Sequence, residues 1–166
     1  EQEGIRESLA LLAHGTHLYE DLTVRENLEF AAAMRRQEAL PLEALLERVG
    51  LGEAAGERVR ALSSGMKRRL ALAKVMLAEP AILLLDEPFT NLDQAAVALL
   101  EGYVGEVLAR AGTVIMATHD LARGYAACRR AAVLVNGRLI HEAPARAGGL
   151  EVLRAAYVAA TGEGGG

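Results

Sequence analysis

The chain has 166 residues, 52% of them hydrophobic and 24% charged, with a formal net charge of −4. This length suits one domain with a sizeable core, and the acidic balance argues against a broad nucleic-acid footprint, so we expect no nucleic acid among its partners. The single cysteine, Cys128, excludes an intrachain disulfide and a thiolate metal cluster. The longest strongly apolar run, residues 81–85, is far shorter than the ~18 residues that a membrane span needs. Any membrane role is therefore expected to depend on a partner.

The first third of the chain predicts one strand and two helices. Residues 8–13 form an apolar run that is typical of a buried strand. Thr23 and Glu26 fit a capping box, which predicts a helix from this point to about Gln37. Pro41 opens a second helix, whose leucines share one face and which a glycine ends.

The middle of the chain predicts a loop, a helix and a second strand. A polar loop covers residues 52–60, and Ser63 or Ser64 then caps a helix that ends before Pro80. The apolar run at 81–85 lacks alternation, as in a strand that is covered on both faces of a parallel sheet.

The last third continues the alternation of helices and strands. Asp93 caps a helix, and residues 113–117 predict another buried strand. The pair Asn136-Gly137 indicates a type I′ hairpin, and a final helix is expected over 150–160. The order of elements predicts an α/β fold with a mostly parallel sheet and helices on both faces.

One helix start has the chemistry of a phosphate site. Ser63, Ser64 and Gly65 precede or begin a helix, where backbone amides and hydroxyls meet the positive end of the helix dipole. Gly65 would let a ligand approach the backbone closely. The alternative is an ordinary serine cap. The basic run at 67–69 is either a solvated helix face or part of a nucleotide interface.

Two adjacent carboxylates follow the strand at 81–85. Asp86 and Glu87 lie at its carboxyl end, where ligands bind in open α/β sheets. Neighbouring strand residues point to opposite faces, so the two carboxylates need not share a role. The alternative is a pair of acidic residues at an exposed strand end.

These motifs together resemble a known family. The sequence Leu-Ser-Ser-Gly-Met-Lys-Arg-Arg at 62–69 and the sequence Ile-Leu-Leu-Leu-Asp-Glu-Pro at 82–88 resemble the signature motif and Walker B strand of ABC ATPases. Residues 89–93 resemble the D-loop of that family, and Thr-His-Asp at 118–120 resembles its switch histidine. The passage at 18–28 is similar to the family's route from the Q-loop into a helical subdomain.

The resemblance assigns two groups of site residues. Ser63, Ser64 and Gly65 would close over the γ-phosphate of ATP that is held by the opposite subunit, and Asp93 in the D-loop would cross the dimer interface. The second group would serve the subunit's own ATP. Asp86 would hold Mg²⁺ through water, and Glu87 would be the general base. His119 would contact the γ-phosphate and the attacking water, and His14 stands in place of the Q-loop glutamine.

The resemblance also implies a P-loop NTPase-like fold with an α-helical subdomain. It divides the chain into a core strand with the Q-loop (1–22), a helical subdomain (23–61), a catalytic core (62–148) and a C-terminal helix with a tail (149–166). No Gly-x-x-x-x-Gly-Lys-Ser/Thr loop, the Walker A motif, occurs in the sequence, and Glu1 stands where a methionine would start a protein. We therefore expect an N-terminal truncation and no activity from these residues alone.

The expected function is that of an ATP-binding and ATP-hydrolysing subunit of an ABC transporter, with ATP and Mg²⁺ as cofactors. A second ABC ATPase subunit, in a homodimer or heterodimer, and a membrane subunit at the Q-loop and helical subdomain are the expected partners. The protein would be cytoplasmic and peripheral on the inner face of the cell membrane. It would power export, and the specific candidate is export of haem for cytochrome c biogenesis. The alternatives are a non-transport ABC ATPase acting on DNA or ribosomes, and a non-catalytic interaction module.

Overall fold

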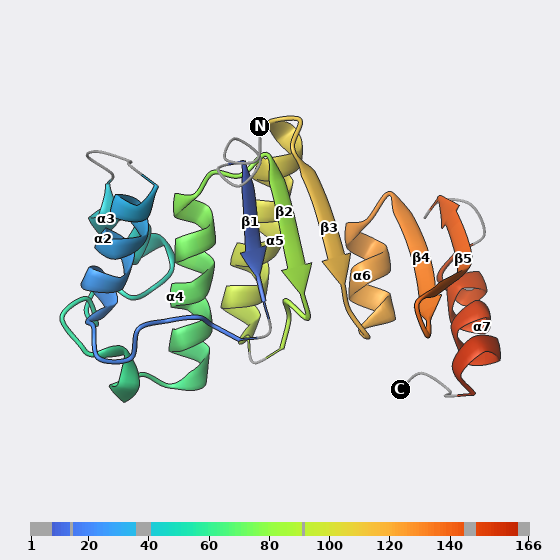
Figure 1. Cartoon of the computed structure of the whole chain (residues 1–166), viewed down its shortest axis with the longest axis horizontal. Helices are drawn as coiled ribbons and strands as arrows, with labels where there is room; N and C mark the ends of the chain where they lie inside the picture. The colour runs from blue at the N-terminus through green and yellow to red at the C-terminus, as the bar shows by residue number, and fades with distance from the viewer. Residues whose placement is uncertain (1–7, 14, 36–40, 91, 145–148, 163–166) are drawn as a thin grey trace. The chain divides into compact units, whose positions relative to one another are not determined.

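The computed structural model describes residues 8–13, 15–35, 41–90, 92–144 and 149–162. The chain divides into two compact units, residues 1–116 and residues 117–166, and each is described by itself. The first unit carries a three-stranded sheet and the second a two-stranded hairpin (Figure 1). None of the helices in these described ranges is long and apolar enough to cross a lipid bilayer.

The sheet of the first unit has the strand order β1-β2-β3. Its strands are β1 (Leu9–Leu12), β2 (Ile82–Asp86) and β3 (Thr113–Ala117). Strands β1 and β2 pair in parallel, with Leu12 beside Leu85. The three arrows point the same way in Figure 1. The predicted α/β fold with a parallel sheet is thus confirmed. Because β1 and β2 are parallel, the segments that follow them leave the sheet at the same edge.

Two long helices contribute to the core of this unit. Helix α4 (Ser64–Leu77) precedes β2, and helix α5 (Gln94–Ala109) follows it. Their apolar side chains form one buried cluster with alternate residues of β1 and β2, including Leu12 and Leu85. The buried Tyr103 hydroxyl of α5 donates a hydrogen bond of 3.2 Å to the Val75 carbonyl of α4. This cluster holds the carboxyl ends of the strands in fixed positions.

The two faces of the sheet are not equally covered, which corrects the prediction of strands buried on both faces. Leu83 and Leu85 of β2 are buried, whereas Ile82 and Leu84 between them are only partly buried. In β3, Ile115 is 58% exposed. Side chains alternate between the faces of a strand, and only one set reaches the cluster with α4 and α5.

The predicted helices between β1 and α4 are present. Helix α2 (Val24–Met34) begins with the expected capping box, in which Thr23 accepts a hydrogen bond from the Glu26 amide at 3.1 Å and Glu26 accepts one from the Thr23 amide at 2.7 Å. Helix α3 (Leu42–Arg48) follows Pro41. The predicted end of the first helix, Gln37, lies outside the described residues.

The segment at 52–60, predicted as a polar loop, is partly buried in the structure. It buries Ala54 and leads into the 3-10 helix η1 (Val59–Ala61), whose first residue is fully buried. Backbone hydrogen bonds join it to the start of α2, including those from the Val24 amide to the Glu57 carbonyl and from the Val59 amide to the Leu22 carbonyl. The loop is therefore a fixed part of the helical region. The predicted boundaries of that region, 23–61, stay a prediction.

The second unit contains the predicted hairpin between two helices. Its elements are α6 (Leu121–Ala127), β4 (Arg130–Val135), β5 (Arg138–Pro144) and α7 (Gly149–Thr161). Strands β4 and β5 pair antiparallel across Asn136 and Gly137, whose φ angles of +50° and +75° are both positive, as a type I′ turn requires. This hairpin prediction is confirmed.

Candidate functional site

The first candidate surface is the exposed start of α4. Ser63 is the cap, because its side chain accepts a hydrogen bond from the Met66 amide at 3.2 Å. Ser63 and Ser64 are exposed, and Gly65 is partly buried in the first turn. The start of a helix of 14 residues presents amides and a positive dipole end to solvent, so this surface has the chemistry of an anion site. The structure thereby chooses Ser63 over Ser64 as the cap.

The second candidate surface is the carboxyl end of β2. Asp86 is the last residue of the strand and is exposed, and Glu87 follows it, partly buried. Glu87 has a φ of +46°, a left-handed conformation that is unusual for a residue with a side chain. Strained backbone of this kind clusters at functional sites, which makes Glu87 a candidate catalytic residue on structural grounds as well.

The oxygen ligands at this strand end suit Mg²⁺. A carboxylate such as that of Asp86 is the hard ligand that Mg²⁺ prefers, and Mg²⁺ usually keeps several waters and takes substrate phosphates as further ligands. Within the part of the chain that the structure describes, there is no group of three or more His, Cys, Asp or Glu that could hold a metal ion alone. The exposed carboxylate of Asp86 is thus one oxygen ligand that could face a hydrated Mg²⁺.

Asp93 is positioned by α5. It is the N-cap of that helix, and its carboxylate accepts a hydrogen bond from the Ala96 amide at 2.7 Å. The cap prediction is confirmed, whereas a role for Asp93 at a dimer interface stays a prediction. Asn91, in the middle of the D-loop-like segment, lies outside the described residues.

His119 belongs to the second unit. It is exposed and lies directly after Thr118, whose hydroxyl accepts a hydrogen bond from the Asp120 amide at 3.1 Å. Asp120 in turn caps α6 by accepting from the Arg123 amide at 3.0 Å. These local bonds fix the turn that carries the histidine. Its role toward a nucleotide stays a prediction, as does that of His14, which lies outside the described residues.

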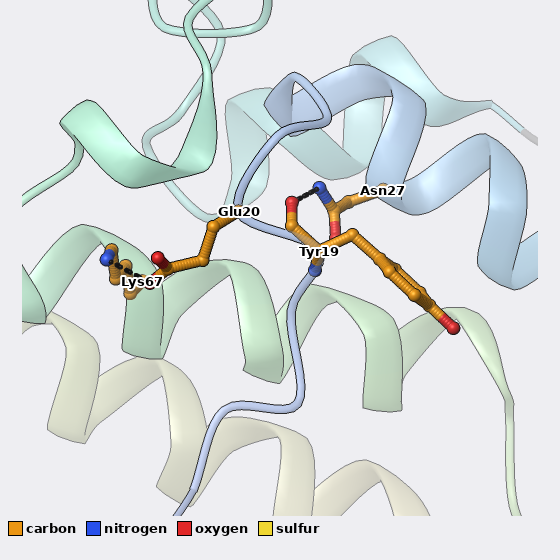
Figure 2. Close-up of polar contacts among 4 residues, drawn as sticks. All are labelled: Tyr19, Glu20, Asn27 and Lys67. Atoms are coloured by element: carbon orange, nitrogen blue, oxygen red, sulfur yellow. Dashed lines mark hydrogen bonds and ion pairs between the residues drawn. The ribbon is translucent and has the colours of Figure 1, made fainter.

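The basic run of α4 is bonded to neighbouring segments. The interpretation as a solvated face is wrong for Arg68, which is buried, whereas Lys67 makes an exposed ion pair. Lys67 pairs with Glu20 at 2.8 Å, as Figure 2 shows. Arg68 is only 4% exposed and donates hydrogen bonds to backbone carbonyls. Arg69 donates to the carbonyls of Val49 and Gly50 at 3.4 Å. The run therefore braces α4 against the segments around it.

A groove of about 380 Å³ lies beside the segment that follows β1. Its lining comes from β1, α2 and α4 and includes the exposed apolar side chains of Tyr19, Phe30 and Met34. The Tyr19 and Phe30 rings meet edge to face with their centroids 4.8 Å apart. Lys74 also lines the groove, where its ammonium donates to the His17 carbonyl at 2.7 Å and burial lowers its pKa. The groove thus combines exposed apolar side chains with a cation in its lining.

Two buried polar residues, Asn27 and Arg68, were not identified from the sequence. Asn27 is 1% exposed, and its amide group accepts from the Tyr19 amide at 2.9 Å and donates to the Tyr19 carbonyl at 3.0 Å (Figure 2). It holds the segment before α2 in place. A signal was available, because Asn27 falls beside Leu28 and three residues after Val24 on the apolar face. Arg68 had no comparable signal, because its neighbours in the sequence are also basic.

Comparisons with known proteins agree with the family resemblance and the fold. The family model described as "ABC transporter" matches residues 1–90. A solved structure described as the ATP-binding subunit of an ABC transporter superposes with a TM-score of 0.82 at 27% identity, covering 96% of this chain and 71% of that one. The cbiO1 protein of Clostridium perfringens, part of the ABC transporter complex cbiONQ, gives a TM-score of 0.68 at 27% identity, covering 94% of this chain and 63% of its own.

Curated relatives are similar over much of the chain. The lipoprotein-releasing system ATP-binding protein LolD 2 of Rhodospirillum rubrum is 41% identical over 78% of this chain and 58% of its own. The Nod factor export ATP-binding protein I of Rhizobium sp. strain N33 is 38% identical over 82% and 46%. The cytochrome c biogenesis ATP-binding export protein CcmA 2 of Cupriavidus metallidurans is 41% identical over 68% and 54%.

The fold and the matches define an α/β ATPase domain of the P-loop NTPase type. The chain belongs to the ABC transporter family, as an ATP-binding subunit domain. It spans about half the length of the curated relatives that it matches.

Proposed function

We propose that the protein hydrolyses ATP to drive a membrane transporter. The observation that carries this proposal is the end of β2, where an exposed carboxylate and a left-handed glutamate follow each other at the carboxyl edge of a parallel sheet. Ligands bind at this edge in open α/β sheets. Asp86 would ligate Mg²⁺ through water, and Glu87 would accept a proton from the water that attacks the γ-phosphate. Mg²⁺ bound with ATP would neutralise the charge that develops on the phosphates.

Two copies of the ATPase would act together. In this arrangement Ser63, Ser64 and Gly65 offer their amides and hydroxyls to ATP on the opposite subunit. The exposed start of α4 supports this, because both serines are accessible to a partner at the positive end of a helix dipole. Asp93 would lie at the same interface, and His119 and His14 would approach the subunit's own γ-phosphate.

ATP binding is proposed to need a phosphate loop in addition to these 166 residues. That loop supplies most contacts to the β- and γ-phosphates in P-loop NTPases. Titration of Mg-ATP into the isolated chain tests this by calorimetry. We expect no binding in the micromolar range, and micromolar binding would contradict the proposal. The full-length gene product should bind and hydrolyse ATP.

The groove beside β1 is proposed to receive an amphipathic segment of the membrane subunit. Its exposed aromatic and methionine side chains suit an apolar helix face, and Lys74 in its lining suits an acidic residue on that helix. Met34, which is 70% exposed, can be changed without opening the core. Met34→Glu should abolish co-purification of the full-length protein with the membrane subunit of its transporter, whereas the matched variant Leu108→Glu on α5 should not. Equal retention by both variants would contradict the docking site. Docking at this groove would hold the ATPase on the inner face of the cell membrane.

The transported substrate is proposed to be haem, exported for cytochrome c biogenesis. The relative named for cytochrome c biogenesis supports this at 41% identity. Deleting the gene should then leave c-type cytochromes without haem while other exports continue. The equally similar relative from a lipoprotein-releasing system supports a second candidate, lipoprotein release, for which lipoproteins would accumulate in the inner membrane instead. The relatives lend no support to a DNA- or ribosome-associated ATPase.

A further inference from the structure

Arg68 occupies an unusual position for a guanidinium group. It lies in the second turn of α4 and is 4% exposed. Burial lowers the pKa of this side chain, and the negative charge of Asp86 opposes that effect. A buried cation is unfavourable unless it is hydrogen-bonded and paired, so its bonds report what holds it there.

Those bonds join the ends of two strands. One terminal nitrogen of Arg68 donates to the carbonyl of Ala13, directly after β1, and the other donates to the carbonyl of Glu87 at 3.0 Å. Strands β1 and β2 are parallel neighbours, so these two carbonyls emerge at the same edge of the sheet. The planar fork of an arginine can span two acceptors in a fixed geometry, which a lysine ammonium cannot reproduce.

The bond from Arg68 to the Glu87 carbonyl matters because Glu87 has an unusual backbone conformation. Glu87 has a φ of +46°, and its carbonyl also accepts a hydrogen bond from the Thr90 amide at 3.3 Å. A left-handed residue with a side chain persists only where its surroundings enforce that conformation. The direction of the Glu87 side chain follows from this backbone conformation, and Arg68 hydrogen-bonds to the carbonyl of the same residue.

We propose that Arg68 is a positioning residue for ATP hydrolysis: it ties the Glu87 backbone to the end of β1 and so aims the Glu87 carboxylate. The inference rests on the proposed role of Glu87 as the general base. Arg68 itself touches backbone carbonyls and takes no part in proton transfer. Its loss should therefore reduce turnover without weakening ATP binding.

The test uses the full-length gene product and three variants. Arg68→Met keeps the length of the side chain and removes the donors, and Arg68→Lys keeps the charge but not the fork. Tyr103→Phe is the control, because it also removes a buried side-chain hydrogen bond to a carbonyl, that of Val75. We expect kcat to fall about tenfold to a hundredfold in Arg68→Met, since small misplacement of a catalytic group has effects of that size. The KM for ATP should stay within about twofold, Arg68→Lys should fall between Arg68→Met and the wild type, and Tyr103→Phe should keep its kcat.

Hydrogen exchange gives a readout that does not depend on activity. The amides of residues 86, 87, 89 and 90 should exchange faster in Arg68→Met than in the wild type, and Tyr103→Phe should leave them unchanged. A kcat equal to the wild-type value, or unaltered exchange of these amides, would overturn the inference. If Arg68→Met does not fold, the same comparison is made with Arg68→Lys. If Glu87→Gln retains full kcat, the proposed role of Glu87 as the general base fails, while the exchange result still decides whether Arg68 holds this turn.

Discussion

The first and second turns of α4 differ in what their polar groups contact. The first turn presents Ser63 and Ser64 to solvent, with one serine hydroxyl used only to cap its own helix. In the second turn, Lys67 pairs with the exposed carboxylate of Glu20, whereas Arg68 is buried and donates to the carbonyl of Glu87. A motif that is continuous in sequence thus divides into an exposed part, at Ser63 and Ser64, and a part that is bonded to other segments, at Lys67 and Arg68. The two parts should fail in different ways when they are altered.

The largest expected effect is that of changing Glu87, the residue whose carbonyl is bound by Arg68. Glu87→Gln removes the proposed base and keeps the shape of the side chain. Because general-base catalysis typically contributes about 10²- to 10⁴-fold, we expect kcat of the full-length protein to fall by that factor. ATP binding, measured by calorimetry in parallel, should be retained. A loss smaller than tenfold would remove Glu87 from the mechanism.

The exposed first turn of α4 should respond to a negative charge. Gly65→Asp places a carboxylate where the opposite subunit's γ-phosphate is proposed to bind, so kcat should fall at least about tenfold, or 1.4 kcal/mol of activation free energy. The thermal midpoint of the monomer should change little, since an acidic residue is favourable in the first turn of a helix. Unchanged ATPase activity in a dimer would show that this surface contacts no nucleotide.

A smaller effect distinguishes the two serines of the first turn. Ser63→Ala removes the side chain that accepts from the Met66 amide, and loss of an N-cap typically lowers stability by about 1 kcal/mol. Ser64→Ala should leave the free energy of unfolding nearly unchanged. Urea denaturation of both variants measures the difference. Equal destabilisation would mean that the cap is shared.

The smallest effect concerns the exposed ion pair of the second turn. The hydrogen bond from Lys67, followed by its charge, lowers the pKa of Glu20. A carboxyl with a lowered folded-state pKa stabilises the fold above its unfolded-state pKa, and that contribution is lost as the pH falls through the folded-state pKa. Glu20→Gln should therefore be slightly less stable than the wild type at pH 7 and equal to it in acid. A difference that persists in acid would indicate a packing effect instead.

The sequence predicts most of the local structure because short-range rules govern it. The caps at Thr23, Ser63 and Asp93 and the turn at Asn136 each depend on residues within four positions. Side-chain chemistry also placed Asp86 and Glu87 correctly at a strand end.

Long-range contacts were harder to predict. The bond from Arg68 to Ala13 joins residues 55 positions apart, and nothing in the run of basic residues marks one of them as buried. The coverage of the sheet likewise depends on which face α4 and α5 occupy, so the partial exposure of Leu84 and Ile115 did not follow from their apolar character. Tertiary packing decides such features.

The central claim is that the start of α4 serves the opposite subunit's ATP while Asp86 and Glu87 serve their own. Mixed dimers of the full-length protein test it directly. With Gly65→Asp in one subunit and Glu87→Gln in the other, both defects fall in the same nucleotide site and the second site stays intact. With both substitutions in one subunit, each site carries one defect. The account predicts ATPase activity in the first dimer and little in the second; equal activity, or more activity in the second, would contradict it.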